Sequence, residues 1–127
     1  MARKLDRYVV RFEVPHYGQP AIIAVEARVH AEKIQRVAIK YGNFKRNWSG
    51  KGTKVIGEGS FSALSSTVEV TVTAEHQGGN GSWYENKYRR VDFPALMPRS
   101  PASIEIRTDK GGRADYNDLV VTLRWTG

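Results

Sequence analysis

The sequence predicts an all-β domain, an antiparallel β-sandwich of about eight or nine short strands. Apolar residues recur mainly with a period of two, which is typical of half-buried strands rather than helices. Clusters of Gly, Pro, Asn and Ser interrupt this pattern at short intervals, as turns do between the strands of a sandwich or barrel. The 127 residues contain no cysteine, so we expect a single domain, residues 1–127, that buries its core without disulfide bonds.

The first half of the chain contains five candidate strands. Pro15 ends the first of them, because proline cannot donate to a strand ladder. In the third, Val37 and Ile39 favour a strand, although a short helix stays open as an alternative. The expected strands are residues 8–14, 21–29, 34–41, 54–56 and 60–64.

The second half gives the clearest alternation. Val68–Glu75 places valine or alanine at every second position, and Asn80–Gly81 is the preferred corner of a tight hairpin that leads into a returning strand. The segment Phe93–Pro101 holds three of the five prolines, so we expect it to cross between the two sheets rather than to form a central strand. The expected strands here are residues 68–75, 83–91, 103–108 and 119–125.

The net charge of +7 is unevenly distributed. Residues 1–60 hold 12 of the 20 Lys and Arg residues but 5 of the 13 acids, whereas residues 61–127 are balanced. Such a basic excess suits nucleic acid, an anionic membrane surface or acidic glycans, or it is simply a solvated face. No apolar run reaches the roughly 20 residues of a membrane span. The charged start also lacks the apolar core of a secretory signal, so the compartment is left open as cytoplasmic or reached by a non-classical route.

The segment 109–118 carries the most informative chemistry. Asp109, Asp115 and Asp118 supply three carboxylates and Asn117 supplies an amide carbonyl, all on a glycine-containing loop between two strands. Calcium ions prefer six to eight such oxygen ligands on irregular loops. The alternative is an Asp- and Asn-rich turn that caps its own backbone.

These residues also resemble a known family, the bacterial two-calcium fucose/mannose-binding lectins. The run Asp115–Val121, followed by Trp125 and Gly127, resembles the C-terminus of that family. Weaker similarity covers most of the rest of the chain. It is carried by Phe12–Pro15, Trp48–Thr53, Val55–Gly57 and Val68–Thr73.

The resemblance implies a β-sandwich lectin that binds one sugar through two adjacent calcium ions. It also implies a homodimer in which the C-terminal glycine carboxylate reaches the partner's site. On this basis the expected metal ligands are Asp109, Asp115, Asn117, Asp118, the backbone carbonyl of Ala27 and the carboxylate of Gly127.

The chain departs from the family pattern at the ligands. Arg113 stands where the family has an acidic residue, and Lys110 adds a second positive charge. A guanidinium can pair with two carboxylates, so we expect Arg113 to replace at least one cation, leaving one calcium ion or none. Arg28 falls at a position that helps to set the sugar preference. We therefore expect Arg28, Arg113 and Lys110 to contact the glycan.

The expected function is non-enzymatic glycan recognition with calcium dependence reduced or lost. Two alternatives remain: an oligomeric assembly module without sugar binding, and a binder of anionic polymers through the basic first half. Lys40–Trp48 interleaves cations with aromatic residues, as nucleic-acid stacking platforms do, but nucleic acid is the less favoured partner. The three histidines lack zinc-ligand spacing. Asp109 and Asp115, so close to Lys and Arg, fit an ion site or salt bridge better than a glycosidase pair.

Overall fold

The computed structural model describes residues 8–15, 19–97, 100–109 and 118–126. Every element in these ranges is a β-strand, and every strand pairing is antiparallel, which confirms the predicted all-β class. The strands are β1 (Tyr8–Glu13), β2 (Ile22–Tyr41), β3 (Phe44–Ser62), β4 (Thr67–Gln77), β5 (Trp83–Glu85), β6 (Lys87–Phe93), β7 (Pro101–Asp109) and β8 (Leu119–Thr126).

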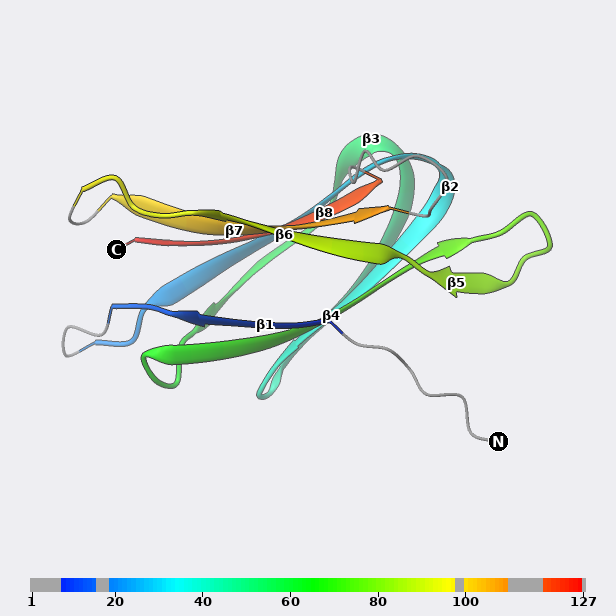
Figure 1. Ribbon diagram of the computed structural model, residues 1–127. Helices are drawn as coiled ribbons and strands as arrows, with labels where there is room; N and C mark the ends of the chain where they lie inside the picture. The colour runs from blue at the N-terminus through cyan, green and yellow to red at the C-terminus, as the bar shows by residue number, and fades with distance from the viewer. Residues whose placement is uncertain (1–7, 16–18, 98–99, 110–117, 127) are drawn as a thin grey trace.

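A long, bent hairpin joins two layers into a sandwich. The strand order is β1-β4-β2-β8-β7-β6, with β3 on β2 and β5 on β4. Residues 24–29 of β2 pair with β8, whereas residues 35–40 of the same strand pair with β4. The β2–β3 ribbon therefore belongs to both layers, and Figure 1 shows it curving between β6, β7 and β8 on one side and β1 and β4 on the other.

The bend in β2 falls where the sequence predicted a break between two strands. The register with β3 shifts between Ala27 and Arg28 and again between Ala31 and Gln35, and such bulges bend a strand. Opposite this corner, Gly52 has φ of +90°, a conformation that favours glycine. The predicted strands at 21–29 and 34–41 are thus one strand of 20 residues, longer than expected.

The core lies between the two layers and is almost entirely aliphatic. Alternate residues of β4 and β8, such as Val70, Val72, Val121 and Leu123, are fully buried, which matches the period of two in the sequence. Aromatic pairs close the sandwich. Phe12 of β1 stacks on Trp125 of β8 with ring centroids 4.7 Å apart, and Tyr8 stacks on Tyr88 of β6 at 5.0 Å.

Two expectations about the second half were wrong. Phe93–Pro101 does not cross between sheets, because it connects β6 to β7, which pair directly with each other. Pro94 directly follows the end of β6, and Pro101 is the first residue of β7, where a missing N–H is tolerated. The predicted strand 83–91 is interrupted at Asn86, which separates β5 from β6.

Candidate functional site

Two buried carboxylates mark the ends of the acidic segment. Asp109 is the last residue of β7 and is 3% exposed, and Asp118 immediately precedes β8 and is 7% exposed. The Asp118 N–H donates to the Thr108 carbonyl at 3.1 Å, so the two strand ends lie side by side. Lys110, Arg113, Asp115 and Asn117 fall between them and lie outside the described residues, as does Gly127.

The corner of the β2–β3 ribbon faces this acidic end. The His30 N–H donates to the Asp118 carbonyl at 2.9 Å, which ties the corner of β2 to the start of β8. A cavity of about 550 Å³ opens at this junction. Its lining residues are His30, Ala31, Glu32, Lys51, Gly52, Thr53 and Asp118.

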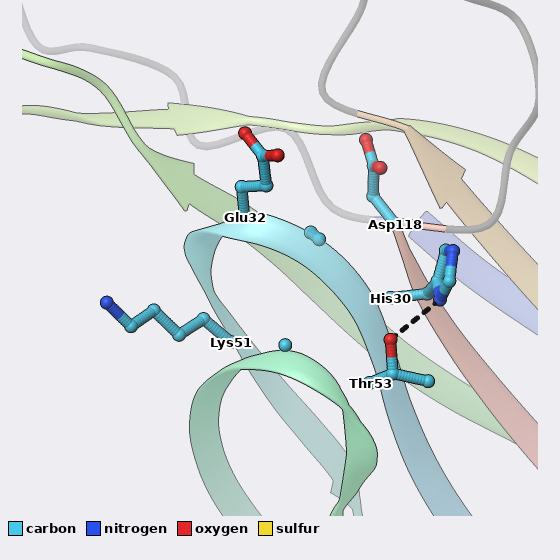
Figure 2. A pocket seen from close by; sticks show the side chains of 7 residues that line it. His30, Glu32, Lys51, Thr53 and Asp118 are labelled. Atoms are coloured by element: carbon cyan, nitrogen blue, oxygen red, sulfur yellow. Dashed lines mark hydrogen bonds between the residues drawn. The ribbon is translucent and has the colours of Figure 1, made fainter.

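The side chains around this cavity are polar and come from both strands of the ribbon. The hydroxyl of Thr53 and Nδ1 of His30 lie 2.9 Å apart and form a hydrogen bond across the corner (Figure 2). In the same view, the carboxylates of Glu32 and Asp118 project to the same side, whereas the Lys51 side chain points in a different direction, away from the β3 ribbon. The residues that line the cavity thus include two carboxylates and one ammonium group.

Sequence reasoning missed Glu32 and His30 as site residues. Both lie in the stretch that the sequence marked as a break between strands, and Glu32 is an isolated acid between basic neighbours. Their position in the sequence could have indicated them, because a break in an alternating pattern can mark a bulge, and a bulge re-aims side chains toward a ligand.

Two residues predicted for the site lie elsewhere along β2. Ala27 is fully buried, with Val121 of β8 and Gly57 of β3 opposite it. Arg28 is exposed, and its guanidinium lies 3.5 Å from the Glu26 carboxylate. The β2 residue bonded to residue 118 is His30, three positions further along. The ligand roles of Ala27 and Arg28 stay predictions.

A buried polar network lies directly beneath the acidic end. The Asn86 amide nitrogen donates to Gln35 Oε1 and to Thr108 Oγ1, each at 2.9 Å, and the Thr108 hydroxyl donates to the Leu119 carbonyl at 2.9 Å. Since that amide group is the donor, the Asn86 carbonyl oxygen accepts from Nδ1 of His76 at 2.7 Å.

This network fixes both ends of the acidic segment. Thr108 precedes Asp109 and Leu119 follows Asp118, while Gln35 follows the corner of β2. Gln35, Asn86 and Thr108 are at most 3% exposed, and the described residues contain no buried side-chain polar atom without a partner. The two strand ends and the corner are therefore held by groups whose hydrogen bonds are all made in a low-dielectric interior.

The donor set of this end suits a hard cation. Asp109 and Asp118 contribute carboxylates, and the sequence between them contains a further Asp and an Asn, whose oxygens are ligand types of calcium. In the described part of the chain, no group of three His, Asp or Glu side chains is close enough to hold a metal. A complete site would therefore need the residues of the segment 110–117.

Together, the strands form a two-layered antiparallel β-sandwich with an open polar cavity beside Asp118. The chain belongs to the fucose-binding lectin II (PA-IIL) family, whose sequence model matches residues 12–127. The family consists of non-enzymatic sugar-binding proteins, which confirms the predictions of a lectin-like domain and of no enzyme. No relative was found among curated protein sequences.

Solved structures share this fold at low sequence identity. A Chromobacterium violaceum lectin, CV2L, solved with alpha-methyl-fucoside, superposes with a TM-score of 0.70 at 22% identity, covering 92% of this chain and 96% of that one. The high-affinity mannose-binding lectin of Ralstonia solanacearum gives 0.70 at 17% identity with the same coverage. The C-terminal domain of the Burkholderia cenocepacia lectin BC2L-C gives 0.63 at 22%, covering 96% and 99%. Among the described residues, a search for helices able to cross a membrane found none.

Proposed function

We propose that this protein binds a glycan in the cavity between the β2–β3 corner and Asp118. The observation that supports this most directly is the hydrogen bond from His30 to Asp118, because it brings a polar cavity to the acidic end that the lectin family uses. The neighbouring structures were solved as fucoside- and mannose-binding lectins, so these two sugars are the first ligands to test.

We propose that calcium assists this binding less than in the family at large. The ligands would be Asp109, Asp115, Asn117 and Asp118, with the Gly127 carboxylate of a second copy, and calcium bound there would supply a positive charge that attracts sugar hydroxyls. Arg113 and Lys110 bring fixed positive charge into the same segment, and each would repel a cation in a poorly solvated loop. With one bound calcium ion, some of these oxygen atoms would coordinate the ion, and the Arg113 guanidinium would neutralise the carboxylates that do not.

Among the described residues that line the cavity, Glu32 has the side chain best suited to orient a sugar. It is exposed, it projects toward the same side as Asp118 in Figure 2, and its carboxylate can accept two hydrogen bonds from neighbouring hydroxyl groups. Carboxylate acceptors discriminate strongly between sugars, because a misplaced hydroxyl leaves a polar group unpaired.

The test is a calorimetric titration of chelator-stripped protein with methyl fucoside and methyl mannoside, repeated after calcium is added. We expect saturable binding of one sugar, tightened by calcium by about tenfold or less, the lower end of a typical coupling between two ligands. Glu32→Gln should weaken that binding by about tenfold, as the loss of a charged hydrogen bond does. Glu58→Gln, an exposed acid on β3, is the matched control and should bind as the wild type does.

Two results would contradict the proposal. If neither sugar binds with or without calcium while the protein is folded, the cavity is not a glycan site. If sugar binding requires calcium absolutely and two ions bind per chain, then Arg113 has not replaced a cation.

A further inference from the structure

The basic excess of the chain is concentrated in the β2–β3 ribbon. Between residues 33 and 57 there are seven Lys and Arg residues and no acid. Arg36 pairs with Glu75 of β4 at 2.9 Å, but within the described ranges no ion pair is found for the other six. These six are Lys33, Lys40, Lys45, Arg46, Lys51 and Lys54, and all are exposed.

Two of these lysines oppose each other in the sheet. Lys40 of β2 and Lys45 of β3 are register partners, so their side chains leave the same face of the ribbon as direct neighbours. Like charges in directly opposite positions destabilise a sheet. Lysines on edge strands also prevent edge-to-edge aggregation, but Lys40 lies on β2, which is paired on both sides at this position. The arrangement is therefore better explained by an anionic group that binds between them.

The strand that carries most of these cations has a free edge beside the glycan cavity. Within the described sheet, β3 pairs with β2 alone, so the backbone groups of its other edge are open over 19 residues. Lys51 lines the cavity, and its side chain points away from the β3 ribbon. Lys54 follows three residues later, and Lys45 lies toward the far tip of the ribbon.

We propose that this cationic rim, defined by Lys40, Lys45, Arg46, Lys51 and Lys54, binds an acidic polysaccharide whose carboxylate or sulfate groups lie along β3. This inference rests on the proposed function, because one sugar of the same chain would occupy the cavity beside Lys51. It names the ligand class: an extended anionic glycan rather than an isolated neutral sugar.

The aromatic residues of the ribbon argue against single-stranded nucleic acid as the occupant. Base stacking needs exposed aromatic rings. Phe44 instead packs on Phe61 at 5.0 Å between ring centroids, and a Cβ on Gly57 would overlap the indole ring of Trp48. Both aromatic side chains belong to the partly buried shell of the core. Both rings are thus only partly exposed, and the rim offers more charge than stacking surface.

The test compares two variants that remove the same charge. The rim variant removes three cations of the rim and spares the cavity; it combines Lys40→Gln, Lys45→Gln and Lys54→Gln. The control variant removes three exposed cations from β1, β6 and β8; it combines Arg11→Gln, Arg89→Gln and Arg124→Gln. The probes are a heparin octasaccharide, an oligogalacturonate and a neutral maltooligosaccharide of equal length, and a short single-stranded DNA.

We expect the wild type to bind at least one acidic probe, with affinity that falls steeply as salt is raised, and to bind the neutral probe weakly. The rim variant should lose about tenfold or more in affinity for the acidic probe, whereas the control variant should change by about twofold or less. Methyl fucoside or methyl mannoside binding should be unchanged in both, which separates this inference from the proposed function.

Three outcomes would overturn it. Equal losses in the two variants would mean that only net charge matters. DNA binding as tight as that of the acidic glycans would indicate an unselective polyanion surface. If the wild type binds a monosaccharide but none of the acidic probes, the binding site is limited to the cavity and the rim has no role in it.

Discussion

Tyr88 shows how one side chain joins the two layers and responds to pH. Its ring stacks on Tyr8 of the other layer, and its hydroxyl accepts a hydrogen bond from the Ala74 N–H of β4 at 2.8 Å. Burial raises the pKa of the Tyr88 hydroxyl well above its ordinary value of 10.0, and the nearby Glu85 and Glu75 carboxylates add to the increase, although the Ala74 hydrogen bond opposes it. The native state therefore holds the phenol proton more tightly than the unfolded chain does.

This difference predicts an alkaline loss of stability. Because the folded pKa is raised, the contribution of Tyr88 is complete below pH of about 10 and declines as the pH rises beyond that value. Tyr88→Phe should lower the free energy of unfolding at neutral pH by about 1–3 kcal/mol, since it leaves the Ala74 N–H unpaired. The gap between wild type and variant should narrow above pH of about 10, as measured by chemical denaturation.

Tyr84 provides the control for this measurement. It is 42% exposed, and its hydroxyl accepts a bond from the Asn80 side chain on the same hairpin. Tyr84→Phe should cost little and should keep the alkaline decline of the wild type. A wild type whose unfolding free energy stays level from pH of about 8 to 11 would contradict the role of Tyr88.

At the scale of elements, the β2–β3 ribbon depends on close contact between two parts of β3, around Gly57 and Trp48. Gly57 lies opposite Ala27, and the Trp48 indole from the other end of β3 covers its Cα. Gly57→Ala would push this ring away, so the free energy of unfolding should fall by about 1–3 kcal/mol, as overpacking in a core does. Thermal or urea denaturation measures the effect.

Gly79 is the matched control for this substitution. A Cβ at Gly79 meets nothing within 4 Å, and its φ is not positive. Gly79→Ala should therefore leave the stability unchanged or slightly raised, because alanine restricts the unfolded chain. If the two variants were equally stable, Trp48 would not be packed against Gly57 in solution.

The same ribbon explains what the sequence could and could not predict. The alternation in Val68–Glu75 and in residues 119–125 specified β4 and β8 correctly, because each has one face in the core and one in solvent. The sequence predicted a break between strands at residues 30–33, yet this stretch is the bulged corner of one strand. The sequence indicated the position but not the continuous strand, because the partner strand determines whether such a stretch stays paired.

The candidate site could likewise be predicted only in part. The sequence pointed to Asp109 and Asp118 because carboxylates on a glycine-containing loop are a local signal of oxygen ligands. Glu32 and Asn86 were missed because their roles depend on contacts distant in sequence: Asn86 bonds to Gln35, 51 positions away. Local patterns therefore located the acidic end but not the wall of the cavity or the network beneath it.

At the scale of the whole molecule, the open question with the clearest structural test is how two copies would meet. The resemblance to the lectin family predicts a homodimer involving β8 and the C-terminal tail. Over residues 119–124, both edges of β8 are occupied, since it pairs with β2 on one side and β7 on the other. Along this stretch a partner can therefore contact β8 through its outward face, which carries Val120, Thr122 and Arg124.

This geometry predicts that a bulky side chain on the outward face of β8 prevents dimerisation. Thr122 lies between Glu26 of β2 and Glu105 of β7, at the centre of that face. Thr122→Trp should convert a dimeric wild type into a monomer, measured by sedimentation velocity. Thr73→Trp places the same ring on the outward face of the other layer, on β4, and should leave the dimer intact. A monomeric wild type would remove the second copy's Gly127 from the proposed calcium ligands, whereas a dimer that tolerates Thr122→Trp would place the interface on another surface, with the free edge of β3 as the next candidate.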